Sequence, residues 1–167
     1  NANVDLPNEK GRTSLMAAVW MKDDVEVVER LLEANANIDL QDKDGGTALS
    51  YSVARGHAKV VQRLLEAKAN VDLQDQEGAT ALIAAAAQGH VEVVQQLLEA
   101  KANVDLQDQK GATALIAAAK MYGGADVLQL LLNKGANVNL GVVGGQRAGH
   151  FAAKMGRDTL LVLLARH

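Results

Sequence analysis

The sequence predicts an all-α solenoid, in which helix-turn-helix units stack in a row and are joined by β-turns or hairpin-like loops. The first observation behind this prediction is a repeat. The pattern Gly-x-Thr-x-Leu begins at Gly11, Gly45, Gly78 and Gly111, at intervals of 34, 33 and 33 residues, and a degraded copy begins at Gly145. The second observation is that each interval holds two helical patterns and one turn. A fixed period filled by one such unit is typical of repeat proteins, whose neighbouring units share a continuous core.

The third copy illustrates the elements expected in each unit. Residues 70–78, NVDLQDQEG, have the Asn, Asp and Gly content of an exposed turn. Residues 80–88, TALIAAAAQ, form a predicted helix whose small alanines allow neighbouring helices to approach closely and favour the helical state. Gly89 and His90 interrupt this pattern, and residues 91–100, VEVVQQLLEA, form a second predicted helix. Its apolar face is expected to contain Val91, Val94, Leu97 and Leu98.

Both ends of the predicted helix pair carry recognisable residues. The first helix of four units should be capped by a threonine hydroxyl, which contributes about 1 kcal/mol in each case. These caps are Thr13, Thr47, Thr80 and Thr113. After the second helix, the four units carry Asn35, Lys68, Lys101 and Gly135 at the same place.

We interpret residues 1–167 as a single domain with irregular ends. Its expected parts are the tail of a preceding repeat at 1–7, repeats at 8–41, 42–74, 75–107 and 108–141, and a degenerate terminal repeat at 142–167. Copies one and four each have one extra residue, placed in 20–24 and 120–126, in the connection between the first and second helices. The terminal repeat has Arg147 and Gly149 in place of Thr and Leu, and is apolar at Val162 and Leu163. We therefore expect the apolar residues of this end to be covered by further chain, by a partner or by a second copy of the protein. The alternative is that they pack inward within the repeat.

This pattern resembles the ankyrin repeat over essentially the whole chain. The family's T-P-L-H-x-A-A motif is present as TSLMAAV, TALSYSV and twice as TALIAAA, with proline absent and histidine replaced by Met16, Ser50, Ile83 and Ile116. The resemblance implies protein–protein recognition, through a concave face formed by the first helices of the units and through the tips of the turns. It also makes His57 and His90 turn-packing residues and His150 a hydrogen-bonding structural residue. The resemblance further implies that the backbone turns left-handed after the second helix, at Asn35, Lys68, Lys101 and Gly135. Lysine should cost roughly 1 kcal/mol in that conformation.

The composition argues against several other classes of function. Aromatic residues make up 2% of the 167 residues, the net charge is -3, and there is no cysteine. We therefore expect no nucleic acid partner, no membrane partner and no thiolate metal site, and a cytoplasm-like compartment. No apolar run approaches the length needed to span a bilayer. The isolated histidines and the Gly-rich GVVGG at 141–145 match no catalytic, metal or phosphate motif, so no enzyme activity and no cofactor are expected.

The aromatic residues indicate where a partner would bind. Trp20, Tyr51 and Phe151 fall on expected concave positions, and Tyr122 lies in the second insertion. Binding hot spots are enriched in Trp, Tyr and Arg, whereas local packing is the alternative role for these rings. The full set of predicted partner-binding residues is Arg12, Trp20, Met21, Lys43, Tyr51, Arg55, Gln88, Lys110, Lys120, Met121, Tyr122, Phe151 and Lys154.

The charges on this face suggest the chemistry of the partner. Over the expected tip and concave positions, seven basic residues stand against three acidic ones, although the whole chain is negative. The neighbouring Asp42, Asp75 and Asp108 would reduce this excess, but we expect them to stabilise the turns as hydrogen-bond acceptors. We therefore expect a protein or peptide partner that carries acidic residues and one or two apolar anchors. Two alternatives remain at this stage: a targeting or regulatory segment of a larger enzyme or channel, and a structural spacer in a longer array.

Overall fold

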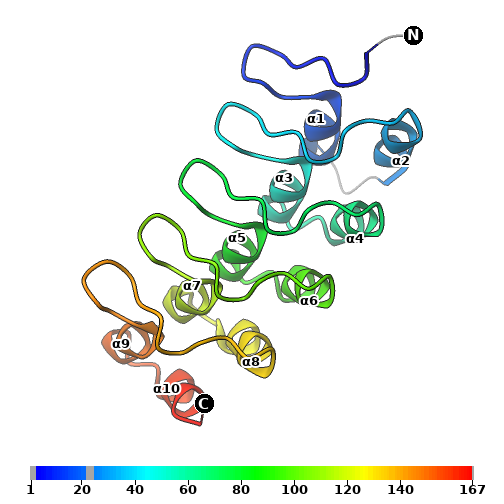
Figure 1. Ribbon diagram of the computed structural model, residues 1–167. Coiled ribbons are helices and arrows are strands. Elements are labelled where there is room, and N and C mark those ends of the chain that lie inside the picture. Colours follow the sequence, from blue (N-terminus) through cyan, green and yellow to red (C-terminus); the bar gives the residue numbers. More distant parts are fainter. Residues whose placement is uncertain (1–2, 22–24, 167) are drawn as a thin grey trace.

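The computed structural model describes residues 3–21 and 25–166, and this part of the chain forms two parallel rows of short helices (Figure 1). The inner row consists of α1 (Ser14–Met21), α3 (Ala48–Ala54), α5 (Ala81–Gln88), α7 (Ala114–Lys120) and α9 (Ala148–Lys154). The outer row consists of α2 (Val25–Glu33), α4 (Ala58–Glu66), α6 (Val91–Glu99), α8 (Ala125–Asn133) and α10 (Asp158–Leu164). Each helix packs on the corresponding helix of the next unit, which confirms the predicted all-α solenoid.

Small and branched aliphatic side chains fill the core between the two rows. The leucine of the repeated Gly-x-Thr-x-Leu pattern is buried in each of the first four units, as Leu15, Leu49, Leu82 and Leu115. In the outer helix α6, the buried residues are Val93, Val94, Leu97 and Leu98. The expectation that Val91 belongs to this apolar face is wrong, because its side chain is 39% exposed and Val93 takes its place. Val91 is the first residue of α6 and lies at the edge of the face formed by the four buried residues, so its side chain stays partly open to solvent.

The predicted threonine caps are present at the start of the inner helices. The hydroxyl oxygen of Thr80 accepts a hydrogen bond from the N–H of Ile83, at 3.3 Å, and Thr113 accepts one from Ile116 at the same distance. Thr13 and Thr47 cap α1 and α3 in the same way. In the terminal unit, which has Arg147 in place of the capping threonine, the backbone N–H of Arg147 donates to Nδ1 of His150 instead. His150 therefore has the structural hydrogen-bonding role expected of it.

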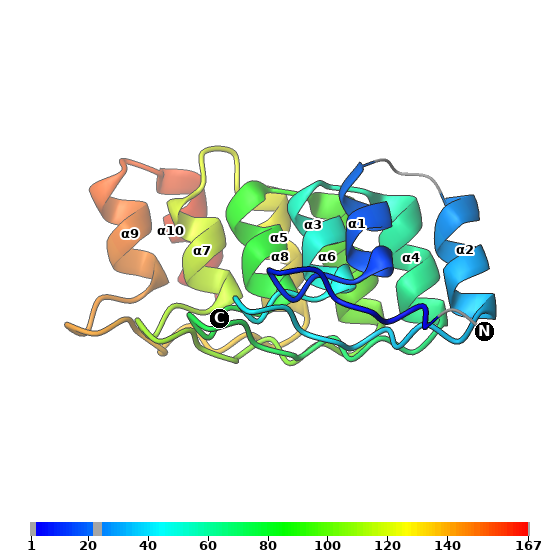
Figure 2. The same cartoon turned by 90° about the horizontal axis from the view of Figure 1, so that it is seen from above.

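The turns that precede the inner helices lie side by side along one edge of the solenoid, below the helices in Figure 2. Backbone hydrogen bonds join each turn tip to the next, from Lys43 to Lys10, from Gln76 to Asp44, from Gln109 to Glu77 and from Val143 to Lys110. Glycine is required in these turns, because Gly45 has a positive φ and a Cβ there would lie 2.7 Å from the backbone of Asp75. The tips are thus fixed relative to one another.

The residues after the outer helices adopt the left-handed conformation that the sequence predicts. The backbone φ angles are 59° at Asn35, 68° at Lys68, 66° at Lys101 and 82° at Gly135. Asn35, Lys68 and Lys101 are the non-glycine residues with positive φ in the described part of the chain. The two lysines therefore occupy a backbone conformation that costs a residue with a Cβ atom.

The ends of the inner helices are covered by side chains from the following unit. Nδ1 of His57 lies 3.0 Å from the carbonyl oxygen of Val19, and the His90 ring lies against Gly56. The Met121 side chain lies against Gly89. These contacts support the turn-packing role expected for the two histidines. The insertion predicted at 120–126 is a longer connection between α7 and α8, whereas the first insertion falls largely on residues 22–24, outside the described residues.

The C-terminal unit leaves part of its apolar surface uncovered. Leu160 is buried, but Val162 is 52% exposed, and Leu161, Leu163 and Leu164 are half-buried. Nothing lies within 4 Å of the position that a Cβ would take at Gly149, where the other units have a buried leucine. A pocket of about 390 Å³ at this end is lined by Val138, Asn139, Arg147, Gly149, His150, Ala153, Leu161, Leu164 and Ala165. Within the described residues, none of the helices is both long and apolar enough to cross a membrane.

Candidate binding surface

The residues predicted to bind a partner lie on the inner helices or in the turns and connections next to them. We call this surface the inner-helix face, defined by the exposed side of α1, α3, α5, α7 and α9 together with the turn tips. Lys43 and Lys110 are exposed at two tips, and Gln88 is exposed as the last residue of α5. The other predicted residues gather at the two ends of the face, on α1 and α3 and on α7 and α9.

The N-terminal cluster consists of Arg12, Trp20, Asp42, Tyr51 and Arg55. The rings of Trp20 and Tyr51 meet edge to face, with centroids 5.5 Å apart and planes at 90°. The guanidinium of Arg55 lies 4.8 Å from the centroid of Trp20, and that of Arg12 lies 5.0 Å from the centroid of Tyr51. Both arrangements are favourable cation–π contacts, and the ring pair has a preferred aromatic geometry. The two rings and two cations therefore hold one another in place.

Asp42 connects this cluster to the turn of the second unit. Its carboxylate accepts hydrogen bonds from the backbone N–H groups of Asp44 and Gly46, at 3.0 and 2.8 Å. Asp75 and Asp108 make the equivalent turn contacts in the next two units, so the expectation of turn-stabilising aspartates is confirmed. Asp42 alone of the three also accepts from the Tyr51 hydroxyl and from Nε of Arg12, at 3.2 Å in the latter case.

These contacts determine the charge of the N-terminal cluster. Burial raises the pKa of Asp42, but hydrogen bonds from Tyr51, the turn backbone and Arg12 lower that pKa more strongly, so it lies below its ordinary value. Burial and the neighbouring carboxylate raise the pKa of Tyr51. At neutral pH the Arg12–Asp42 pair therefore has no net charge and Tyr51 is protonated. Among residues 3–21 and 25–166 Arg55 makes no ion pair, so it is the uncompensated charge of the cluster.

A pocket of about 190 Å³ opens beside the N-terminal cluster. It is lined by Asn8, Arg12, Met16, Ala17, Trp20, Met21 and Tyr51. Trp20 is 43% exposed and Met21 is 75% exposed, although both are large apolar residues. The alternative role of Tyr51, local packing, is also present in part, because its ring is half-buried against the core.

The middle of the inner-helix face is built from small side chains. Ala84 is half-buried and Ala87 is exposed on α5, so this part of the face has no large apolar group of its own. A shallow pocket of about 310 Å³ lies on this face where α5 meets α7, and it is lined by Ile83, Ala87, Asp108, Ala112, Ala117, Lys120 and Met121. A partner segment lying here would approach the backbone of α5 closely, because alanine leaves space above the helix.

The C-terminal cluster consists of Lys120, Met121, Tyr122, Phe151 and Arg157. Nζ of Lys120 lies 4.3 Å from the centroid of the Phe151 ring, and the guanidinium of Arg157 lies 5.7 Å from that of Tyr122. The same guanidinium donates to the carbonyl oxygens of Ala119 at 3.0 Å, Lys120 at 3.3 Å and Met121. Tyr122 is 93% exposed. Lys154 is exposed nearby on α9.

Sequence reasoning missed two residues of these clusters. Asp42 was assigned only to the turn, because nothing in its local sequence indicates that Tyr51 and Arg12 reach it. Arg157 was assigned no role, yet it follows Gly156 as His57 follows Gly56 and His90 follows Gly89. This shared position was the signal that could have identified it.

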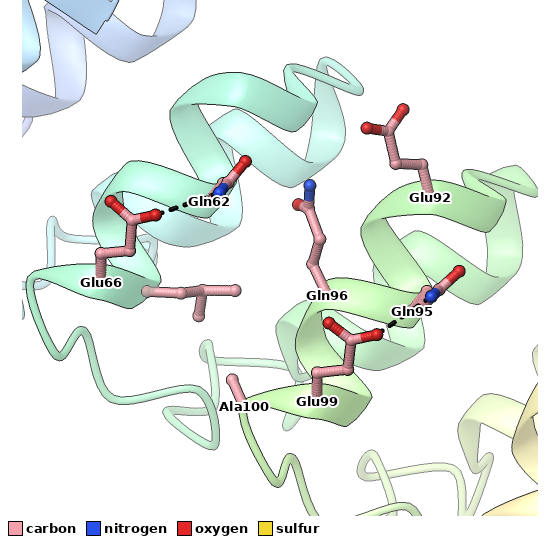
Figure 3. A pocket seen from close by; sticks show the side chains of 8 residues that line it. Gln62, Glu66, Glu92, Gln95, Gln96, Glu99 and Ala100 are labelled. Carbon is pink, nitrogen blue, oxygen red and sulfur yellow. Dashed lines mark hydrogen bonds between the residues drawn. The ribbon is translucent and has the colours of Figure 1, made fainter.

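A further pocket, of about 570 Å³, lies on the opposite side of the solenoid between the outer helices α4 and α6 (Figure 3). It is lined by Gln62, Leu65, Glu66, Glu92, Gln95, Gln96, Glu99 and Ala100. Glu66 and Glu99 accept hydrogen bonds from Gln62 and Gln95, one turn earlier on the same helix, as Figure 3 shows. The pocket is polar and lacks aromatic residues. No group of three or more His, Asp or Glu side chains suited to a metal ion occurs in the described part of the chain.

Comparison with known proteins gives two results. The sequence matches the family model described as "Ankyrin repeats (3 copies)" over residues 15–108 and again over residues 94–167. A segment of 57 residues, 32% of this chain, is 44% identical to ankyrin repeat domain-containing protein 63 from Homo sapiens, and the Mus musculus protein of that name matches to the same extent. That segment covers 15% of the length of each of these relatives.

Proposed function

Because the chain belongs to the ankyrin-repeat family, a non-enzymatic fold whose members are generally protein–protein interaction modules, we propose that it binds a partner protein segment through its inner-helix face and turn tips. One observation carries the proposal. In a chain whose core is aliphatic, the aromatic side chains lie on or beside this face, and each is paired with a cation. The few residues that supply most of the binding energy in protein interfaces are enriched in Trp, Tyr and Arg.

The charges support an acidic partner segment. Lys43, Lys110 and Lys154 are exposed on the inner-helix face, and the charge of Arg55 is uncompensated within the described residues. The charge of Arg12, by contrast, is compensated by Asp42, so the excess of basic groups available to a partner is smaller than the sequence suggests. Electrostatic complementarity of this kind speeds association and weakens as the salt concentration rises.

The proposal requires no reaction and no cofactor. The described histidines are engaged in packing or in hydrogen bonds to neighbouring backbone or side-chain groups. The proposed binding therefore depends on the shape of the inner-helix face, on its aromatic anchors and on its charge. The structural-spacer alternative differs in one testable respect, because a spacer would have no partner that depends on Trp20, Arg55 or Met121.

The test is affinity capture with the whole chain, followed by measurement of direct binding to the purified captured protein. Three baits are compared: the unchanged chain, the double variant Trp20→Ala/Arg55→Ala on the inner-helix face, and the matched double variant Gln62→Ala/Gln95→Ala on the outer helices. We expect the inner-face variant to weaken binding at least about tenfold, as for a loss of hot-spot contacts, and the outer-face variant to bind normally. Raising the salt concentration should weaken binding to the unchanged chain.

A partner retained by the inner-face variant and lost by the outer-face variant would contradict the proposal. Retention of every captured protein by both variants would favour the spacer. Each variant must first show an unchanged helical circular dichroism spectrum, so that lost binding is not lost folding.

A further inference from the structure

We propose that the pocket beside the N-terminal cluster holds one apolar side chain of the partner segment, and that Arg55 binds an acidic side chain next to that anchor. This inference rests on the proposed function and specifies its chemistry. It assigns the principal contact to α1 and α3 rather than to the whole length of the inner-helix face.

The size of the pocket fits one side chain. Its volume is about 190 Å³. An apolar cavity of about 150 Å³ holds a benzene molecule, so this pocket can accept a phenyl ring or a branched aliphatic group but not a peptide segment. Its lining of Met16, Ala17, Trp20, Met21 and the Tyr51 ring is mainly apolar, which favours a hydrophobic anchor.

Most of the pocket wall is fixed before a partner arrives. The Tyr51 hydroxyl is bound to Asp42, Trp20 stands edge-on to Tyr51, and Arg12 is tied to the same carboxylate. A wall that is already ordered reduces the entropy lost on binding. Met21, in contrast, is exposed at the end of α1 and has a flexible side chain that can close over different anchors.

The charges next to the pocket select an acidic neighbour and disfavour a basic one. Arg55 lies against the Trp20 ring, which is also part of the pocket wall, and makes no ion pair within the described residues. A carboxylate one residue from the anchor could therefore pair with this guanidinium. A lysine at the same place would meet Arg55, and both aromatic rings already carry a cation. The pocket is thus unsuited to a cationic anchor.

The pocket over α5, in the third unit, has a different lining. Ala84 of α5 is equivalent to Ala17 of α1, counted from the capping threonines Thr80 and Thr13. The shallow pocket over α5 contains no aromatic residue, so it offers no comparable wall. Ala84 therefore supplies a matched control for changes at Ala17.

The experiment uses three small probes: N-acetyl-Phe-Glu-amide, N-acetyl-Phe-Lys-amide and N-acetyl-Ala-Glu-amide. Trp20 is the single tryptophan of the chain, so its fluorescence reports occupation of the pocket directly. Ligand-observed saturation-transfer NMR gives a second measurement that does not depend on Trp20. We expect the Phe-Glu probe to bind with a dissociation constant of about 1 mM, and the other two at least about tenfold more weakly.

Three variants of the whole chain complete the test. Ala17→Met fills the pocket from its own wall and should abolish binding of the Phe-Glu probe, whereas Ala84→Met should leave it unchanged. Arg55→Gln should lower the affinity for Phe-Glu to that for a Phe-Gln probe. Equal binding of Phe-Lys and Phe-Glu, or full binding by Ala17→Met, overturns the inference.

The same variants separate this inference from the proposed function. If a captured partner binds through the inner-helix face but is unaffected by Ala17→Met and Arg55→Gln, the pocket inference fails and the proposed function stands. If the partner is unaffected by every inner-face variant, the proposed function fails whatever the small probes do.

Discussion

The nine-residue segments 78–86 and 111–119 have the same sequence, GATALIAAA, yet the helices that they start are followed by different structures. In both segments the third residue is a threonine that caps the helix through a 3.3 Å hydrogen bond, and the leucine two positions later is buried. The helix α5 is followed by Gly89 in the left-handed conformation, whereas α7 is followed by Met121 in an extended one. The start of each helix is thus the same, and its C-terminal end, here called the exit, differs.

The difference shows which parts of a unit depend on its own sequence and which depend on the next unit. Capping requires only residues three apart within one segment. The exit of α5 is covered by the Met121 side chain, and the exit of α7 is held by Arg157, whose guanidinium donates to three consecutive carbonyl groups. Met121 and Arg157 belong to the following units. The surface formed at each exit is therefore a property of a pair of units.

The largest effect is expected from Arg157→Ala, which removes the side chain that distinguishes the α7 exit. Loss of its hydrogen bonds leaves carbonyl groups at the end of α7 without that donor, and should destabilise the C-terminal end by about 2 to 3 kcal/mol. Chemical denaturation gives the loss in unfolding free energy. Hydrogen exchange should become faster in α7 to α10 and remain unchanged in α3 to α5, because each unit contacts only its neighbours.

Arg166→Ala is the matched control, since that arginine is exposed at the C-terminal end. It should change the stability by no more than about 0.5 kcal/mol. Arg157→Lys keeps the positive charge but not the planar set of guanidinium N–H donors. Its loss of unfolding free energy should therefore be smaller than that of Arg157→Ala, but not zero. Equal stability of the Arg157→Ala and Arg166→Ala variants would show that the α7 exit does not depend on the next unit.

The same contrast explains how much could be predicted from the sequence. The caps at Thr80 and Thr113 follow from a local rule, and the left-handed residues Lys68 and Lys101 follow from the family resemblance together with the period. Both were predicted correctly. The Val91 assignment failed because a periodicity cannot locate the first turn of a helix to one residue.

The contacts of the candidate binding surface are of another kind. Arg12 and Asp42 are 30 residues apart, and Arg157 is 38 residues from Ala119. Such pairs depend on the offset between stacked units and on side-chain rotamers, neither of which the repeat pattern specifies. The sequence therefore predicted which residues lie on the inner-helix face, but not how Asp42 orders Tyr51 and Arg12.

A smaller effect tests whether the helices α5 and α7 are capped equally well at their N-terminal ends. Thr80→Ala and Thr113→Ala each remove one cap, and each should lower the unfolding free energy by about 1 kcal/mol. The two losses should agree within about 0.5 kcal/mol, because the capping geometry is the same. Thr80→Ser and Thr113→Ser retain the hydroxyl and serve as controls. A clearly larger loss at Thr113 would show that the neighbouring insertion also affects the start of α7.

The smallest effect concerns Lys68 and Lys101, which follow the outer helices α4 and α6 and precede the turns of the third and fourth units. Their φ angles, 68° and 66°, lie in a region that costs a residue with a Cβ atom about 1 to 2 kcal/mol, whereas glycine adds about 0.5 to 1 kcal/mol of unfolded-state entropy. Lys68→Gly and Lys101→Gly should therefore each stabilise the protein by about 0.5 to 1 kcal/mol, seen as a rise in melting temperature of about 1 to 3 °C. Asn35→Gly should give almost no gain, since asparagine tolerates this conformation, and Gly135→Lys should lower the melting temperature by a similar amount. If neither lysine variant melts higher, the strain attributed to the left-handed residues is absent. If only one does, the two units differ before their first helix as well as after it.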